Sequence, residues 1–395
     1  MRTLSPPLTL VITTDAVGGV WRYALDLAGT LKGRALAVAD DAPQVVEPLL
    51  IGLGPRPSEA QRDEAYEAGV ALDWIDRPLD WQVEGPEALS ESGRALAAAV
   101  TAAGADLVQV NNPPLLPFLP AQLPRIAAAH SCLSTWWQAV RGETPPLNLA
   151  WHGAATARGL AAADAVISPS HAFAAAMTEI YGPVPDLAVV PNAAVPVMAG
   201  RKRPVALAAA RWWDPAKNLA VLDAAAEGAL WPVEIAGPLE GPGSWGSGGA
   251  GSGGAGSGGA GPRPVHVTHL GSLPHRALRA RMAEAAIFVS LALYEPFGLS
   301  VLEAAGAGAA LVLSDIPTHR ELWDDCACFV DPHDPHAVRD ALDGLVRDPA
   351  ALGRMGLLAT TRAATFSHAR QADAMLAVYA RVLARHTADR GDAVP

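Results

Sequence analysis

The chain has 395 residues, of which 50% are hydrophobic and 17% are charged, and its formal net charge is -11. The length favours two domains, and the acidic balance argues against a nucleic-acid-binding protein. We expect no integral membrane segment, because no apolar run reaches the length of a membrane span. The cysteines do not have the paired spacing of a zinc site, so we expect free thiols in a reducing cytoplasm at Cys132, Cys326 and Cys328.

The first half of the chain alternates strand and helix patterns, which is typical of a parallel sheet covered by helices. The apolar run 8–14 predicts a strand buried on both faces, and a helix pattern follows over 20–31. Between them, Gly18 and Gly19 end a turn that lacks G-x-G-x-x-G, so a dinucleotide-dependent oxidoreductase is disfavoured. Similar patterns predict strands at 35–39, 70–75, 106–110, 126–129, 165–168 and 187–190, and helices at 86–103, 151–163 and 170–181.

Two candidate site features follow the predicted strand 126–129. His130 comes directly after this strand, and in an open α/β sheet the carboxyl ends of the strands face the ligand crevice. The alternative is a histidine that is simply hydrogen-bonded in the core or in a loop. Trp136 and Trp137 offer aromatic faces to a sugar-like acceptor, although such a pair more often packs.

A second series of strand and helix patterns begins with the apolar strand 204–210. It leads to Arg211 and Lys217, and a helix is predicted from near Lys217 to about residue 227. Two cations beside a helix start can neutralise phosphate groups and stabilise a departing diphosphate; a salt-bridged loop is the alternative. The segment 241–261 contains three G-S-G-G-A repeats, which predict a flexible surface loop inside the second domain.

The most informative stretch is Y-E-P-F-G-L-S-V-L-E at 294–303, between a strand pattern and a helix pattern. Pro296 favours extended backbone at Glu295, so this carboxylate belongs to a loop at a strand's carboxyl end. Gly298 allows the backbone to approach a ligand, and the helix that carries Glu303 offers unpaired N–H groups to phosphate oxygens. Carboxylates accept hydrogen bonds from hydroxyls, so the stretch predicts a sugar-nucleotide site; the alternative is a surface loop and a helix with one solvated carboxylate.

The remaining patterns complete a second parallel sheet and a helical end. Strands are predicted at 233–236, 265–270, 286–292, 310–313 and 328–330, and helices at 275–285 and 304–310. Further helices follow the last strand, and the terminal one is predicted at 371–385. Asp315 and Glu321, in the segment S-D-I-P-x-x-R-E, are candidates for function, but the capping of a helix is the simpler explanation.

The stretch E-P-F-G-L-x-x-x-E resembles the E-x7-E motif of retaining glycosyltransferases with the GT-B fold, in particular family 4. Arg211 and Lys217 resemble the arginine and the lysine of the family's G-R…K pattern, with Ala210 in place of its glycine. The resemblance implies an α/β fold of two Rossmann-like domains that face each other across a cleft. It implies an acceptor-side domain, a donor-binding domain and a C-terminal helix that crosses back to the first domain, at residues 1–197, 198–370 and 371–395.

The resemblance also implies a reaction. The expected enzyme is a metal-independent hexosyltransferase without a cofactor, which moves a sugar from a nucleotide-diphosphate-sugar to a small-molecule, glycan or lipid-linked acceptor. Catalytic roles fall on Glu295 at the sugar hydroxyls, on His130 near the transferred sugar, and on Arg211 and Lys217 at the leaving diphosphate. Donor-binding roles fall on these two cations and on Gly18, Gly19, Gly271, Gly298, Leu299 and Glu303, the last at the ribose.

Three other functions remain open at this stage. A sugar phosphorylase or a nucleotide-sugar epimerase would keep the fold and change the reaction. A catalytically silent sugar-nucleotide binder would keep the fold and the donor site. The presence of Glu295, Glu303, Arg211 and Lys217 argues against the silent binder.

Overall fold

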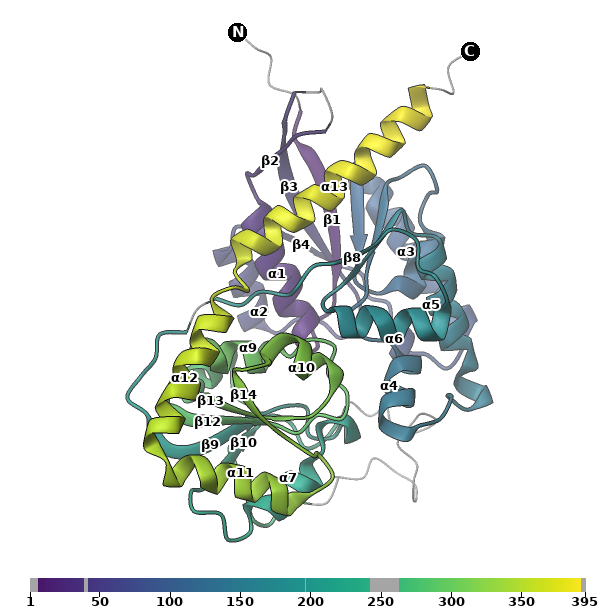
Figure 1. The fold of residues 1–395 in the computed structure, drawn as a ribbon. Coiled ribbons are helices and arrows are strands. Elements are labelled where there is room, and N and C mark those ends of the chain that lie inside the picture. The colour runs from purple at the N-terminus through teal and green to yellow at the C-terminus, as the bar shows by residue number, and fades with distance from the viewer. Residues whose placement is uncertain (1–5, 39–41, 196, 242–262, 392–395) are drawn as a thin grey trace.

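The structure is a computed structural model that describes residues 6–38, 42–195, 197–241 and 263–391. The apolar strand patterns form two parallel sheets, one in each half of the chain, with helices packed on both faces (Figure 1). The loop predicted at 241–261 lies, apart from its first residue, outside the described residues. No helix within the described ranges is long and apolar enough to cross a membrane.

The first sheet has eight strands among the described residues, in the order β2-β3-β1-β5-β6-β7-β8, with β4 beside β3. All its pairs are parallel except that of β2 with β3. The strands are β1 Leu8–Thr14, β2 Ala35–Leu36, β3 Gln44–Gly52, β4 Ala71–Trp74, β5 Leu107–Val110, β6 Arg125–Ala128, β7 Ala165–Ser168 and β8 Leu187–Val189. The helices are α1 Gly19–Leu31, α2 Glu59–Glu67, α3 Pro86–Ala102, α4 Leu133–Arg141, α5 Ala150–Ala161 and α6 His171–Tyr181.

The second sheet is entirely parallel in the part that the structure describes, in the order β11-β10-β9-β12-β13-β14. Its strands are β9 Arg203–Ala209, β10 Val233–Ala236, β11 Thr268–His269, β12 Ala285–Ser290, β13 Ala310–Ser314 and β14 Ala327–Val330. The helices are α7 Leu219–Ala226, α8 His275–Glu284, α9 Leu299–Gly306, α10 Pro317–Trp323, α11 Pro335–Arg347, α12 Pro349–Ala363 and α13 His368–Gly391. These two sheets confirm the predicted α/β class, while the exact domain boundaries stay predictions.

Three predicted elements are wrong in extent. The strands predicted at 35–39 and 265–270 shrink to β2 and β11, which lie at the ends of their sheets and have one neighbour each. The helix predicted at 304–310 is α9, which begins earlier, at Leu299, and ends at Gly306, because Gly308 takes a left-handed φ of 82° and Ala310 already begins β13. An Ala-rich run is therefore divided between a helix and a strand by one glycine.

Three elements have no counterpart in the sequence prediction: β3, α2 and α4. In β3 the charged and proline residues Glu47 and Pro48 hide the strand pattern. Pro48 lies opposite Leu10 of β1, while β2 pairs with residues before it and β4 with residues after it. Its missing N–H therefore falls where the outer edge of β3 has no partner, and a proline is tolerated there.

The last helix, α13, returns to the first domain, as Figure 1 shows for the yellow helix across the purple strands and helix α1. Its apolar side chains join the core that contains β1 and α1, and Met375, Tyr379 and Val382 have no exposed surface there. Each fully buried side chain of this size contributes about 1.5–3 kcal/mol. The crossing helix predicted at 371–385 is thus confirmed, with longer ends.

Helix α6 of the first domain begins against the second domain. Its N-cap, Ser170, accepts a hydrogen bond from the backbone N–H of Phe173 and donates one to the carbonyl of Pro296. Glu321 of α10 accepts hydrogen bonds from the backbone N–H groups of His171 and Ala172, at 2.8 and 2.6 Å. A carboxylate from one domain therefore caps a helix of the other. The sequence favoured a capped helix within the segment 314–321 itself, but the N-cap of α10, Ile316, makes no side-chain cap bond.

We expect Glu321→Ala to lower the free energy of unfolding by about 1–2 kcal/mol, because two helix N–H groups lose a charged acceptor. Urea-induced unfolding measures the difference. Asp315→Ala is the matched control, since Asp315 pairs with Arg320 within one domain and both side chains are about half exposed. That change is expected to cost less than about 0.5 kcal/mol. Equal losses in the two variants would contradict a special role for the contact between domains.

Candidate functional site

A cavity of about 940 Å³ lies between the two domains, within the range of roughly 300–1,000 Å³ that small-molecule sites occupy. Both domains line it with the loops that follow the carboxyl ends of their strands, the usual place of ligands in open α/β sheets. The sequence-predicted site residues that line it are Gly18, Gly19, His130, Arg211, Lys217, Glu295, Gly298, Leu299 and Glu303. Gly271 does not line it, although its neighbours Ser272 and Leu273 do.

Glu295 and Lys217 form an ion pair in this cavity. The Nζ of Lys217 donates to Oε2 of Glu295 at 2.8 Å, and the two side chains are 14% and 19% exposed. Burial raises the pKa of Glu295, but the charge and hydrogen bond of Lys217, together with smaller effects of His319 and Arg211, outweigh burial, so the pKa lies below its usual value. The carboxylate is therefore ionised at neutral pH and its Oε2 is fixed.

Helix α9 points its N-terminus into the cavity. Gly298 is its N-cap, with a left-handed φ of 90°, and no side chain caps the helix. Gly298, Leu299 and Ser300 all line the cavity, so the unpaired N–H groups of the first turn lie at its wall. Such a helix start favours phosphate oxygens, because its N–H groups and dipole are positive toward the cavity.

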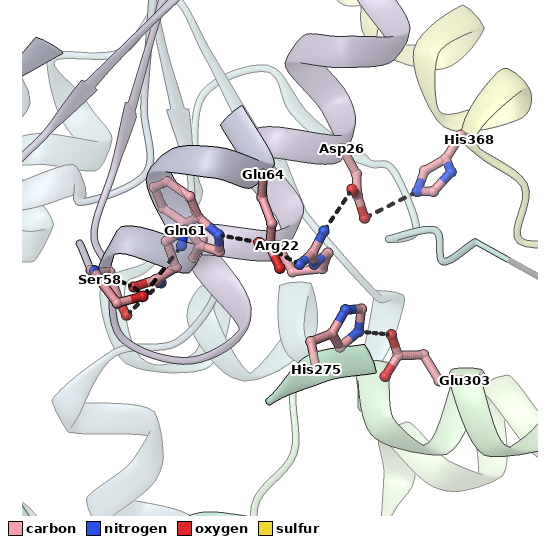
Figure 2. A network of polar contacts seen from close by, with 10 residues as sticks. Arg22, Asp26, Ser58, Gln61, Glu64, His275, Glu303 and His368 are labelled. Atoms are coloured by element: carbon pink, nitrogen blue, oxygen red, sulfur yellow. Dashed lines mark hydrogen bonds and ion pairs between the residues drawn. The ribbon is translucent and has the colours of Figure 1, made fainter. Parts of the chain in front are cut away.

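Glu303 lies one turn further along α9 and is 8% exposed. Its Oε1 accepts a hydrogen bond from Nε2 of His275, the first residue of α8, at 2.7 Å. Figure 2 shows this pair in the second domain together with a polar cluster of the first domain, in which Arg22 donates to Glu64 and Asp26. Arg22, His275 and Glu303 all line the cavity. Sequence analysis placed His275 on a helix and did not include it in the site.

Arg211 lies against the turn that Gly18 and Gly19 form in the first domain. A Cβ atom added to Gly18 would lie 3.4 Å from Nη1 of Arg211, and one added to Gly19 would lie 3.4 Å from Cδ1 of Leu299. Gly18 has a φ of 76°, which favours glycine. The turn thus touches both the cation and the α9 start of the second domain, and the structure brings together four residues that the sequence proposed separately. The guanidinium also lies 5.5 Å from the ring centre of Trp213.

His130 lies at the carboxyl end of β6, as the sequence predicted. Its ring packs against Tyr23 with centroids 4.3 Å apart, and its Nε2 lies 3.2 Å from Oδ1 of Asn111. Burial lowers the pKa of His130 to about 4, so the imidazole is neutral at physiological pH.

The cavity contains polar and aromatic residues that sequence analysis missed. Asp15 follows β1, and burial raises its pKa to about 6, with the nearby charge of Asp80 adding to the effect and Arg211 opposing it. Trp151 and His152 stack at 3.7 Å in the first-domain wall. The position of Asp15 directly after a buried strand could have indicated that it belongs to the site. No pattern in the neighbouring sequence indicates that Trp151 and His152 line the cavity.

Of the two adjacent tryptophans of α4, Trp136 lines the cavity and Trp137 does not. The Nε1 of Trp136 donates to Oδ1 of Asp214 in the second domain at 3.0 Å. Trp137 is 9% exposed and packs with Trp136 and Ala216. An aromatic platform made of both rings stays a prediction, and packing accounts for Trp137. Across the described residues, no group of three histidine, cysteine, aspartate or glutamate side chains is arranged to hold a metal ion.

Two family models match the chain. "Glycosyl transferase 4-like domain" matches residues 18–193 and "Glycosyl transferases group 1" matches residues 263–360. Arg211 and Lys217 lie between the two matched ranges.

Curated relatives match over short stretches. A D-inositol 3-phosphate glycosyltransferase of Mycobacterium avium is 38% identical over 117 residues, which are 28% of this chain and 27% of the relative. A probable sucrose-phosphate synthase of Solanum tuberosum is 42% identical over 66 residues, 16% of this chain and 6% of the relative. The chain therefore matches only a small part of the length of each of these relatives.

Solved structures match over almost the whole chain. The sucrose-phosphate synthase of Thermosynechococcus elongatus has a TM-score of 0.73 at 17% identity, with 96% of this chain and 100% of that chain covered. HepE of Anabaena in complex with UDP and glucose has a TM-score of 0.70 at 14% identity, with 95% and 100% covered. At these identities the similarity establishes the shared fold.

Proposed function

Because this chain belongs to the group 1 glycosyl transferases with the GT-B fold, we propose that it transfers a hexose from a nucleoside-diphosphate sugar to a hydroxyl group, with retention of configuration. The observation that carries the proposal is the grouping of Lys217, Glu295 and Arg211 around the uncapped start of α9. Cations and free N–H groups suit a diphosphate, and a fixed carboxylate suits sugar hydroxyls.

The proposed reaction breaks the bond between the anomeric carbon and the diphosphate oxygen and forms a bond from the same carbon to the acceptor's hydroxyl oxygen, whose proton passes to the departing diphosphate. Arg211, Lys217 and the first N–H groups of α9 stabilise the charge on the leaving diphosphate, so the step needs no metal ion. Lys217 holds Oε2 of Glu295 and leaves Oε1 to accept from a sugar hydroxyl. Glu303 binds the ribose hydroxyls, and the neutral ring of His130 lies beside the transferred sugar. Contact between the domains limits hydrolysis by keeping water out.

The first-domain wall is the proposed acceptor side. It presents the rings of Trp136, Trp151 and His152 together with the carboxylate of Asp80. Aromatic faces pack against the apolar faces of sugars and cyclitols, and carboxylates accept their hydroxyl protons. The three free thiols are consistent with a cytoplasmic setting.

Release of nucleoside diphosphate tests the proposal. The protein is incubated with UDP-, GDP- and ADP-sugars, with UDP-glucose first because a HepE structure contains it. Acceptor candidates start with inositol and D-inositol 3-phosphate, since a curated relative is named for the latter. We expect release from one donor, retention of activity in EDTA, and loss in Glu295→Ala.

Other outcomes identify the alternatives. Conversion of the donor without an acceptor would indicate an epimerase, and dependence on inorganic phosphate would indicate a phosphorylase. Binding of a donor without turnover, even with acceptors pooled from a cell extract, would indicate a silent binder. Each of these results would contradict the proposed transfer.

A further inference from the structure

His130 is held by a side chain at the carboxyl end of the neighbouring strand. Its Nε2 lies 3.2 Å from Oδ1 of Asn111, which follows β5. The amide of Asn111 has a fixed direction, because its Nδ2 donates to the carbonyl of Thr13 at 2.6 Å and its backbone N–H donates to the Thr13 hydroxyl at 2.8 Å. An amide oxygen only accepts, so Nε2 of His130 carries the ring proton and Nδ1 keeps its lone pair.

Gln109 connects Asn111 to the rest of the core. It lies on β5 with no exposed surface, and its Nε2 donates to Oδ1 of Asn111 at 3.0 Å and to the hydroxyl oxygen of Tyr23 at 3.1 Å. Its Oε1 accepts from the hydroxyl of Tyr379 at 2.5 Å. A reversed amide would place its oxygen against Oδ1 of Asn111, with two acceptors facing each other. The contacts at both ends therefore fix one orientation of Gln109.

Tyr379 comes from α13, 270 residues after Gln109 in the sequence, and it is fully buried in the first domain. Through Gln109 it touches both neighbours of His130. Asn111 bonds the ring nitrogen, and the ring of Tyr23 packs edge-on against the imidazole at 65°. The helix that crosses back from the second domain thus supplies the far end of a buried hydrogen-bond chain that ends at the cavity.

We propose that Tyr379 is a positioning residue for His130: its hydroxyl fixes the amide of Gln109, and through Asn111 that amide holds the imidazole in its Nε2–H tautomer. The effect on sugar transfer rests on the proposed function, whereas the effect on the tautomer does not. Two measurements on the full chain separate them.

The first measurement is NMR of the ring nitrogens in protein labelled with ¹⁵N-histidine at neutral pH, with His130→Gln to assign the signals. We expect His130 to show a protonated Nε2 and an unprotonated Nδ1. In Tyr379→Phe the buried Oε1 of Gln109 loses its donor, so a reversed amide, whose oxygen can accept from the Tyr23 hydroxyl, competes with the wild-type orientation. The reversed oxygen faces Oδ1 of Asn111 and weakens the contact that holds the ring proton of His130. The two ring-nitrogen shifts of His130 then move toward each other, as the tautomers average. Unchanged shifts would overturn the proposal.

The second measurement is the rate of nucleoside diphosphate release. We expect Tyr379→Phe to lower kcat about tenfold, because a less well positioned imidazole weakens its contact with the sugar in the transition state, and to leave KM for the donor unchanged. A raised KM with unchanged kcat would contradict the positioning role. If the wild type releases no nucleoside diphosphate from any donor, the proposed function fails while the NMR result still decides the tautomer.

Val382→Ala is the matched control, because Val382 is fully buried on the same helix but makes no bond to the chain of amides. It removes core packing without removing a hydroxyl, so the His130 shifts should stay as in the wild type. If they move in this variant as they do in Tyr379→Phe, the effect belongs to packing of α13 and the proposal is wrong. Gln109→Met, which interrupts the chain without changing any residue of α13, replaces Tyr379→Phe if that variant does not fold.

Discussion

Lys217→Met is expected to lower the free energy of unfolding by about 3–5 kcal/mol and to abolish release of nucleoside diphosphate. The change leaves the carboxylate of Glu295 in a site where its side chain is 19% exposed and its 2.8 Å partner is gone. Removal of one partner from a buried ion pair costs this much because the other charge stays desolvated. Urea-induced unfolding gives the stability, and the nucleotide-release assay gives the activity.

The double variant Lys217→Met with Glu295→Leu separates the two effects. Removing both charges also removes the desolvation cost, so most of the lost stability should return. Activity should not return, because both the diphosphate cation and the sugar-binding carboxylate are absent. A single Lys217 variant within about 1 kcal/mol of the wild type would contradict a structural ion pair. An active double variant would contradict the proposed site.

Unlike Lys217→Met, which affects both quantities, Arg211→Met is expected to have a large effect on activity and a small one on stability. We expect release of nucleoside diphosphate to fall by about 100- to 1,000-fold, the usual effect of removing one preorganised group that stabilises developing negative charge. The side chain is exposed at the cavity wall beside Gly18, so stability should change by less than about 0.5 kcal/mol. Steady-state kinetics with saturating donor measures the first effect and urea unfolding the second.

Arg354→Met is the matched control, since Arg354 is an exposed residue of α12 that does not line the cavity. It removes the same charge from the same domain and should leave the rate within about twofold of the wild type, as expected for a surface change. A comparable loss in both variants would mean that net charge, and not the position of Arg211, governs the reaction.

The sequence by itself determined the elements whose signals are local. The apolar run 8–14 is β1 with the predicted ends, since a continuous β-rich run can be buried on both faces only in a parallel sheet. The places of His130 and Glu295 after strands follow from the same patterns. Gly298 was recognisable because a glycine between a strand and a helix supplies the left-handed backbone that the turn requires.

Only the tertiary structure decided which of these residues meet. Lys217 and Glu295 are 78 positions apart, and Tyr379 reaches Gln109 over 270 positions. Strand β3 escaped prediction because the pairing of its neighbours, and not its own pattern, makes Pro48 acceptable. Residue patterns report backbone preference and the burial of one face, which nearby residues set. Ion pairs, shared hydrogen bonds and pKa values depend on through-space distance and desolvation, which exist only once both domains and the returning helix are packed.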